Sequence, residues 1–226
     1  MNGVILKRGI PRPLEFMTAL LGLLILAPLF LSILIAIRCS SSGPILFRQK
    51  RVGRRGNLFT LLKFRSMVLS DQALQVTARG DSRITSIGKF IRKTKLDELP
   101  ELWNIVKGDL SLVGPRPEVP RYVDLNEPLW QRTLAVRPGL TDPVTLKLRN
   151  EEELLAQVEG NPEGFYLNIL QPLKLKGYIE YLENRSAWTD VEILWKSVLA
   201  VILPRRTPPP GLDKLDLLTG KKPIPE

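Results

Sequence analysis

The chain has 226 residues and a formal net charge of +10, because 33 lysines and arginines face 23 aspartates and glutamates. This balance points to an anionic partner, and it leaves nucleic acid, an anionic membrane surface and a phosphorylated substrate open. Histidine is absent and Cys39 is the single cysteine, which excludes histidine catalysis, an intramolecular disulfide and a thiolate zinc cluster. Any catalysis must therefore rest on carboxylates, lysine, arginine or hydroxyl groups.

The first predicted element is an uncharged apolar segment, residues 16–37, which as one straight helix could cross a hydrocarbon core of roughly 30 Å. Both of its flanks are basic, whereas a spanning helix normally keeps its excess of lysine and arginine on the cytoplasmic side. Pro28 lies near the middle, where it removes a backbone hydrogen bond and favours a kink. We predict a re-entrant helix that bends at Pro28 and returns to the cytoplasmic face. A signal anchor that crosses once is the alternative.

The following segments predict a mixture of short strands and helices. Apolar runs on either side of residues 53–57 indicate a β-hairpin. From about Ser82 to Val106 the apolar residues recur at helical spacing, with a helix beginning around Asp97, started or bent by Pro100 and ended by Gly108. Further helices are predicted at residues 151–155, 172–182 and 188–203, and the last could lie against the core or the membrane surface.

These elements predict a fold of the α/β class in its α+β form. It consists of a small, mostly helical cytosolic domain with a short β-hairpin, joined to an N-terminal re-entrant membrane helix and to amphipathic interfacial helices. The predicted divisions are residues 1–39 for the membrane hairpin, 40–203 for the main domain and 204–226 for a proline-rich tail. Because the tail lacks hydrophobic periodicity, we expect it to be extended or loosely ordered.

The adjacent carboxylates Asp97 and Glu98 are the first candidates for chemistry. Basic residues precede them at Arg92 and Lys95, and nearby positive charge favours ionised carboxylates, which can bind Mg²⁺ or attack phosphorus. On a helix, adjacent side chains point about 100° apart, so one carboxylate could face a substrate while the other holds a metal. The pattern alone also fits a solvated helix face, which is the commoner origin of such pairs.

A second set of groups is suited to phosphate. Lys63 and Arg65 lie close to a predicted strand, and Arg116 lies between Pro115 and Pro117. An arginine fork grips phosphate oxygens with two hydrogen bonds, and flanking prolines reduce the entropy lost when the side chain is fixed. A plain rigid turn is the alternative for this loop.

The order of these motifs resembles that of the bacterial sugar transferase family, the monotopic phosphoglycosyl transferases. The resemblance covers most of the chain and rests on six segments: GPILFRQ at residues 43–49, RVG at 51–53, KFRSM at 63–67, LDELP at 96–100, GDLSLVGPRP at 108–117 and RPGLT at 137–141.

The resemblance implies transfer of a sugar-1-phosphate from a nucleotide diphosphate sugar, with UDP as the expected nucleotide, to polyprenyl (undecaprenyl) phosphate. The products would be UMP and a polyprenyl-diphosphate sugar, in the first membrane step of glycoconjugate or exopolysaccharide synthesis at the cytoplasmic face of the bacterial inner membrane. It also implies a covalent aspartyl-phosphosugar intermediate, with residues 40–203 as the catalytic domain. A non-catalytic membrane scaffold derived from the same family is the alternative.

The resemblance also assigns roles to individual residues. Asp97 would be the nucleophile and Glu98 its partner in metal binding or proton handling, with Mg²⁺ as the cofactor of this pair. Basic side chains would bind the phosphates, and with the charge pattern above the candidates are Lys63, Arg65, Arg92 and Arg116. The expected partners are the nucleotide sugar, polyprenyl phosphate and membrane lipids, with a homodimer left open. Nucleic acid is not expected, because no reading motif accompanies the basic residues.

Three positions depart from the family pattern. Ala27 stands where a serine often precedes the proline of the break, which removes a hydroxyl that could bond to the backbone, and Glu15 stands where many members have aspartate. Residues 142–145, DPVT, stand where many relatives have a Gly-Trp-Ala-Gln type of sequence. The resemblance therefore assigns no particular sugar.

Overall fold

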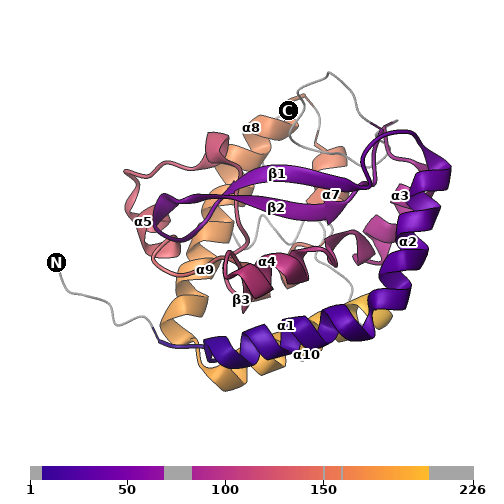
Figure 1. The fold of residues 1–226 in the computed structure, drawn as a ribbon. Coiled ribbons are helices and arrows are strands. Elements are labelled where there is room, and N and C mark those ends of the chain that lie inside the picture. Colours follow the sequence, from indigo (N-terminus) through magenta and orange to yellow (C-terminus); the bar gives the residue numbers. More distant parts are fainter. Residues whose placement is uncertain (1–6, 69–82, 150, 159, 204–226) are drawn as a thin grey trace.

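The computed structural model describes residues 7–68, 83–149, 151–158 and 160–203, and the predicted tail from Pro204 lies outside them (Figure 1). Within the described residues the chain is mostly helical, with two small two-stranded sheets. The predicted α+β class is confirmed at this level.

The apolar N-terminal segment folds into two helices rather than one. Helix α1 (Arg12–Ile25) and helix α2 (Ala27–Ser40) meet at Leu26 and are bent by 60°. Pro28 lies in the first turn of α2, where its missing N–H leaves no bond unmade, and the break falls on its N-terminal side, where its ring would clash with the preceding turn. In the described part of the chain no single helix is long and apolar enough to cross a membrane, while this bent pair passes by length and composition.

The predicted β-hairpin is confirmed. Strand β1 (Leu46–Val52) pairs antiparallel with β2 (Leu58–Phe64), in a register that sets Val52 opposite Leu58. A short 3₁₀ turn, η1 (Arg54–Gly56), connects the strands, with Arg55 at φ 59° and Gly56 at φ 81°. The hairpin extends alongside α4 (Figure 1), and the Asn104 side chain bonds to the backbone of Leu62 and Thr60 on β2.

The predicted helix beginning at Asp97 is wrong in detail. Helix α3 (Ser86–Lys93) ends at Thr94, and Lys95 then takes a left-handed conformation with φ 56°. Asp97 and Glu98 lie on a 3₁₀ turn, η2 (Leu96–Glu98), and helix α4 (Glu101–Lys107) begins only after Pro100. Gly108 ends α4 at φ 91°, as predicted, because a residue with a Cβ rarely adopts this conformation.

One parallel pair of strands was not predicted from the sequence. Strand β3 (Ser111–Val113) lies beside β4 (Gly139–Thr141), and the chain between them contains the short helices η3 (Pro120–Tyr122) and α5 (Pro128–Thr133). Beyond β3 the backbone of Gly114 approaches Gly139 so closely that a Cβ on Gly139 would lie 2.1 Å from the Gly114 nitrogen. The GPRP loop is therefore fixed against β4.

The C-terminal helices confirm the predicted spans. After α6 (Pro143–Lys147) come α7 (Glu151–Ala156), α8 (Pro162–Phe165), the π-helical turn η4 (Tyr166–Leu170), α9 (Gln171–Asn184) and α10 (Ala187–Ile202). In Figure 1, α10 lies alongside α1 at one edge of the molecule.

Helix α1 is packed into the core as well as exposing an apolar face. Ala19 is fully buried with Ile105 and Leu112, whereas the Leu24 side chain is 66% exposed. Buried Glu15 accepts the N–H of Leu112 at 3.2 Å, so the longer side chain that replaces the family's aspartate reaches β3. Just before α1, the Ile10 N–H donates to Asp190 at the start of α10 at 3.0 Å.

Candidate active site

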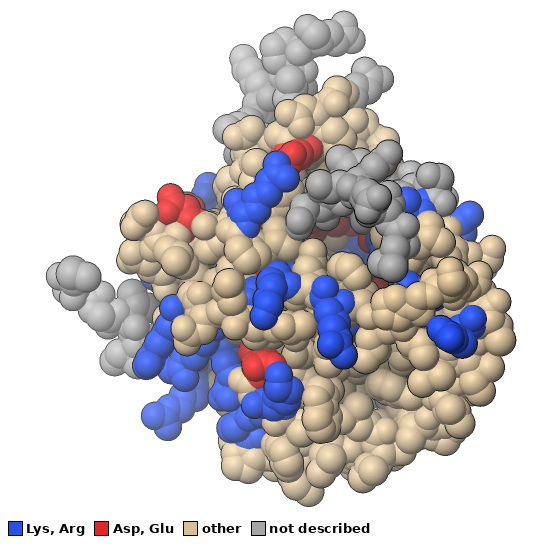
Figure 2. Space-filling view, turned by 45° about the horizontal axis from the view of Figure 1, so that its top comes forward, with Lys and Arg blue, Asp and Glu red and all other residues tan. Residues whose placement is uncertain are grey.

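One cavity of ≈ 1650 Å³ collects most of the residues selected from the sequence. Its walls come from α2, the hairpin, the η2 turn, the GPRP loop, α7 and the η4–α9 region. The charged side chains of the face shown in Figure 2 are mainly lysine and arginine, in keeping with the net charge of the chain. The predicted phosphate-binding residues line this cavity together with both carboxylates: Lys63, Arg65, Arg92, Asp97, Glu98 and Arg116.

Asp97 and Glu98 have opposite electrostatic surroundings. Asp97 is 7% exposed, and its Oδ1 has no hydrogen-bond partner in the part of the chain that the structure describes. Burial, and then the charge of Glu98, raise the pKa of Asp97. For Glu98 burial also acts to raise the pKa, but the charges of Arg116 and Lys63 outweigh it and hold the pKa well below its usual range. The expectation that nearby cations favour ionisation therefore holds for Glu98, while for Asp97 the shift has the reverse direction.

Glu98 organises two of the predicted phosphate-binding cations. Lys63 Nζ lies 2.8 Å from Glu98 Oε1, and the Arg116 guanidinium donates to the same oxygen. The charge of Glu98 is the main reason that the pKa of Arg116 lies well above its usual range. The loop that carries Arg116 is fixed by bonds from Gly114 N to Thr141 O at 3.0 Å and from Gly139 N to Pro115 O at 2.9 Å. Both cations are thus held in place before a ligand arrives.

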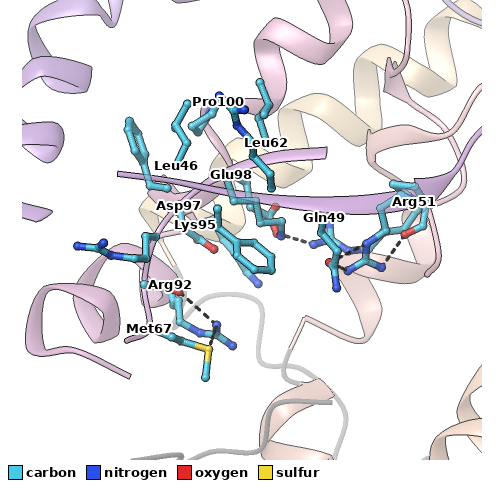
Figure 3. Close-up of a pocket in the computed structure, with 18 of the residues that line it drawn as sticks. Leu46, Gln49, Arg51, Leu62, Met67, Arg92, Lys95, Asp97, Glu98 and Pro100 are labelled. Atoms are coloured by element: carbon cyan, nitrogen blue, oxygen red, sulfur yellow. Dashed lines mark hydrogen bonds and ion pairs between the residues drawn. The ribbon is translucent and has the colours of Figure 1, made fainter. Parts of the chain in front are cut away.

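Arg92 and Arg65 occupy a different wall of the cavity. Arg92 donates to Ser66 Oγ at 3.3 Å and pairs with Glu152. In Figure 3, Arg92 and Met67 lie on one side of Asp97 and Glu98, and Gln49 and Arg51 lie on the other. Arg65 is 3% exposed and donates to the carbonyl oxygen and hydroxyl of Ser41, at 2.7 and 2.9 Å. Pro28 is not among the cavity-lining residues, but Phe30, Leu31 and Leu34 of the same helix are.

Sequence reasoning missed several polar residues of this region. Glu118 accepts hydrogen bonds from Arg51 and Tyr166, and Lys174 donates to Tyr166 at 3.3 Å and to Glu151 at 3.1 Å. These contacts join positions far apart in the chain, and no local pattern marks them. Glu101 was missed as well, although its place three residues after Glu98 was a readable signal.

Glu101 is a buried carboxylate beside the site. It is 1% exposed, and its Oε1 lies 3.4 Å from Lys63 Nζ and has no hydrogen-bond partner among the residues described. Burial is the main cause that raises the pKa of Glu101 to about 7, and the Lys63 charge opposes it. Lys63 therefore lies between an ionised carboxylate and one that is largely protonated below neutral pH.

This shift predicts a pH-dependent stability that Glu101→Gln removes. Because the folded-state pKa is raised, the folded protein binds the proton more tightly than the unfolded chain does, and this stabilisation is lost as pH rises from about 4.5 through about 7. The wild-type protein should lose roughly 3 kcal/mol at most over this range, and the variant should lack this loss. Urea unfolding of both proteins in detergent at several pH values measures the difference. If the free energy of unfolding changes equally with pH in the two proteins, the raised pKa of Glu101 is contradicted.

The carboxylates partly fit a magnesium site. Among the described residues there is no group of three or more histidine, cysteine, aspartate or glutamate side chains that could hold a metal. Mg²⁺ is often bound by one or two carboxylates plus waters and substrate phosphates, so a smaller set is sufficient. Asp97 fits as a ligand through its free Oδ1, whereas Glu98 Oε1 is already occupied by Lys63 and Arg116.

The DPVT segment begins a helix beside the cavity. Asp142 is fully buried and caps α6, accepting the N–H groups of Val144 and Thr145 at 2.7 and 2.8 Å. Val144 and Thr145 line the cavity. The departure from the family pattern therefore changes the cavity wall rather than a distant surface.

The sequence of this chain is similar to those of several known bacterial proteins. An N-acetylgalactosaminephosphotransferase from Aeromonas hydrophila, named for UDP-N-acetylgalactosamine and undecaprenyl phosphate, is 33% identical over 199 residues, which are 85% of this chain and 44% of that protein. A UDP-glucose:undecaprenyl-phosphate glucose-1-phosphate transferase from Caulobacter vibrioides is 35% identical, over 84% of this chain and 69% of that protein. The exopolysaccharide production protein ExoY of Sinorhizobium fredii is 31% identical, over 86% of each chain.

The chain thus spans less than half of the Aeromonas protein, and a larger share of the other two. The family model described as bacterial sugar transferase matches residues 6–204, which confirms the resemblance inferred from the six motifs. The chain therefore belongs to the bacterial sugar transferase family.

Proposed function

We propose that this protein transfers a sugar-1-phosphate from a UDP-sugar to polyprenyl phosphate. The observation that carries the proposal is the buried Asp97 carboxylate, whose Oδ1 has no hydrogen-bond partner among the described residues, in a cavity lined by cations. The names of the relatives, which include UDP-sugars and undecaprenyl phosphate, support the same substrates.

In the first half-reaction an Asp97 oxygen attacks the β-phosphorus of the donor. The bond from that phosphorus to the bridging oxygen breaks, UMP leaves with that oxygen, and the phosphosugar is joined to Asp97. The attack needs an ionised carboxylate, and the Lys63, Lys95 and Arg92 charges counter the effect of burial on the pKa of Asp97. Lys63 and Arg116, positioned by Glu98, lie where they can neutralise phosphate oxygens during transfer.

In the second half-reaction an oxygen of the polyprenyl phosphate attacks the same phosphorus. The bond to Asp97 breaks, a diphosphate link forms and the carboxylate is regenerated. Mg²⁺, when bound, would neutralise diphosphate charge and so favour departure of UMP. Asp97 would hold it, because its Oδ1 has no hydrogen-bond partner among the described residues.

The proposal is tested by separating the two half-reactions. The purified protein with Mg²⁺ and a panel of UDP-sugars, without acceptor, should release about one UMP per enzyme and gain the mass of one phosphosugar. Polyprenyl phosphate should then discharge it into a lipid-extractable product. A non-catalytic scaffold would release no UMP with any donor and form no lipid product, and this outcome would contradict the proposal.

We also place the α1–α2 pair in the cytoplasmic leaflet as a re-entrant hairpin. Large apolar side chains are exposed on both helices and on α10, as expected for a surface in contact with lipid: Leu14, Phe16, Met17, Leu21, Leu24, Ile25, Leu31, Leu34, Ile35, Trp188, Val191, Trp195, Val198, Val201 and Ile202. The 60° bend supports a return to the same face.

The topology predicts that residues before α1 and after α2 lie on the same side of the membrane. With exposed Cys39 replaced by Ser, single cysteines at Asn2 and Asn57 should resist an impermeant maleimide until the inner membrane is opened. Pro28→Leu, which restores a backbone donor, should favour a straight helix and expose the Asn2 reporter. If the Asn2 reporter reacts in intact cells without this substitution while the Asn57 reporter is protected, the helix pair crosses the membrane and the hairpin is wrong.

A further inference from the structure

Among the described residues, Arg65 differs from the other buried cations of the cavity because it has no carboxylate partner. Lys63 and Arg116 pair with Glu98, and Arg51 pairs with Glu118. For Arg65, no ion pair with a carboxylate is found among the described residues. Its Nη2 donates to Ser41, while its Nε and Nη1 are buried and have no hydrogen-bond partner among the described residues. A buried guanidinium with two nitrogens whose N–H groups have no partner there favours binding of an anion at this point.

The surroundings of Arg65 indicate which kind of anion would bind. Phe64, the preceding residue, packs against Phe30 of α2 with ring centroids 5.3 Å apart. Leu31 and Leu34 of the same helix line the cavity, and they are 58% and 37% exposed. Ser41, the hydrogen-bond partner of Arg65, ends this helix. An apolar wall formed by the proposed membrane hairpin thus leads up to a cation, which suits a phosphate carried at the end of an apolar chain.

The position is also connected to the nucleophile. Ser66, next in the chain, accepts a hydrogen bond from Arg92 at 3.3 Å, and the Arg92 charge acts on Asp97. A phosphate bound by Arg65 would therefore lie in the same cavity as Asp97. It would approach from the side of the α1–α2 membrane hairpin. Lys63 and Arg116, by contrast, are held by Glu98.

We infer that Arg65 binds the phosphate of the polyprenyl acceptor, with the start of its prenyl chain against Phe30, Leu31 and Leu34, while Lys63 and Arg116 serve the donor diphosphate. This inference rests on the proposed function and adds a division of the cavity into two phosphate subsites. Arg65 contacts the non-attacking oxygens of the acceptor, and a third oxygen attacks the phosphorus on Asp97. The bond to Asp97 breaks as the new diphosphate link forms, with no change of oxidation state and, for a dianionic phosphate, no proton released.

The test compares full-length wild type with Arg65→Met and Arg65→Lys in detergent. The Met variant should raise the KM for polyprenyl phosphate by about tenfold to a hundredfold, because charge-assisted hydrogen bonds are lost, while UMP release without acceptor stays within about twofold of wild type. The Lys variant keeps the charge and should recover part of the affinity. If Arg65→Met does not fold, the KM of Arg65→Lys for polyprenyl phosphate provides the same test.

Arg48→Met is the matched control, because Arg48 is an exposed cation of β1 that lines the same cavity. It should leave the acceptor KM within about twofold, as expected for an exposed charge. An Arg65 variant that melts like wild type but loses UMP release would show that Arg65 serves the donor, and the inference would be wrong. An unchanged acceptor KM in both variants would also overturn it. Failure of the wild type to release UMP would instead contradict the proposed function.

A membrane phospholipid could offer the same chemistry, a phosphate on an apolar chain. Wild-type transfer is therefore measured with added phosphatidic acid and, separately, with added inorganic phosphate. Neither should compete with polyprenyl phosphate at equal concentration. Competition by phosphatidic acid that disappears in Arg65→Lys would assign Arg65 to general lipid anchoring and overturn the acceptor assignment.

Discussion

Asp97→Asn is expected to reduce turnover by about three orders of magnitude or more, as for loss of other enzymic nucleophiles. The amide has the shape of the carboxylate, so the buried position on η2 should be kept. It has no anionic oxygen, however, and cannot form the aspartyl-phosphosugar. The rate of lipid-product formation and the UMP released without acceptor should both fall to background.

Asp124→Asn is a suitable control for this prediction. Asp124 is exposed and its side chain accepts a local bond from the N–H of Asn126 at 2.8 Å, so its substitution should leave turnover within about twofold. Thermal unfolding of both variants shows whether the fold is intact. Turnover by a folded Asp97→Asn within a few fold of wild type would show that another group attacks the phosphorus.

Removal of divalent cations is expected to abolish activity, and added Mg²⁺ to restore it. The donor diphosphate brings negative charge into a cavity where Lys63 and Arg116 already form ion pairs with Glu98. Further positive charge is therefore needed near Asp97, and its free Oδ1 is the atom available for a metal. Turnover is measured after dialysis against EDTA and again with Mg²⁺.

The magnesium prediction and the nucleophile prediction both involve Asp97, but they can fail separately. Full turnover in chelator would remove the metal from the mechanism, yet it would leave the covalent role of Asp97 open. Conversely, an Asp97→Asn protein that still binds Mg²⁺ by calorimetry would show that the metal has other ligands.

Local signals predicted much of the fold. Pro28 indicated the break between α1 and α2, Gly108 the end of α4, and the polar turn at residues 53–57 the hairpin, because each of these features depends on a few neighbouring residues. The β3–β4 pair was not predictable in this way. Each strand has three residues, and their pairing depends on the close approach of Gly114 and Gly139 across a long connection.

The candidate site, like the fold, was predicted only in part from local signals. The charged motifs identified the residues that the cavity brings together, but not how they share their charges. The opposite pKa shifts of Asp97 and Glu98 arise from burial and from partners on other elements. The left-handed Lys95, which sets the η2 turn, has no marker in its residue type, since lysine rarely adopts positive φ.

The packing of α1 has a consequence for the order of folding during synthesis. Helix α1 completes its contacts only after much of the chain that follows it has been made, because the partner of Glu15 is Leu112, 97 residues later, and the partner of Ile10 is Asp190, 180 residues later. Until β3 and α10 have been made, the Glu15 carboxylate, the Ile10 N–H and an apolar helix lack these tertiary contacts. In the proposed membrane placement, an early encounter with the lipid bilayer would shelter the apolar face during this interval, and membrane contact would then be coupled to tertiary folding in time as well as in space.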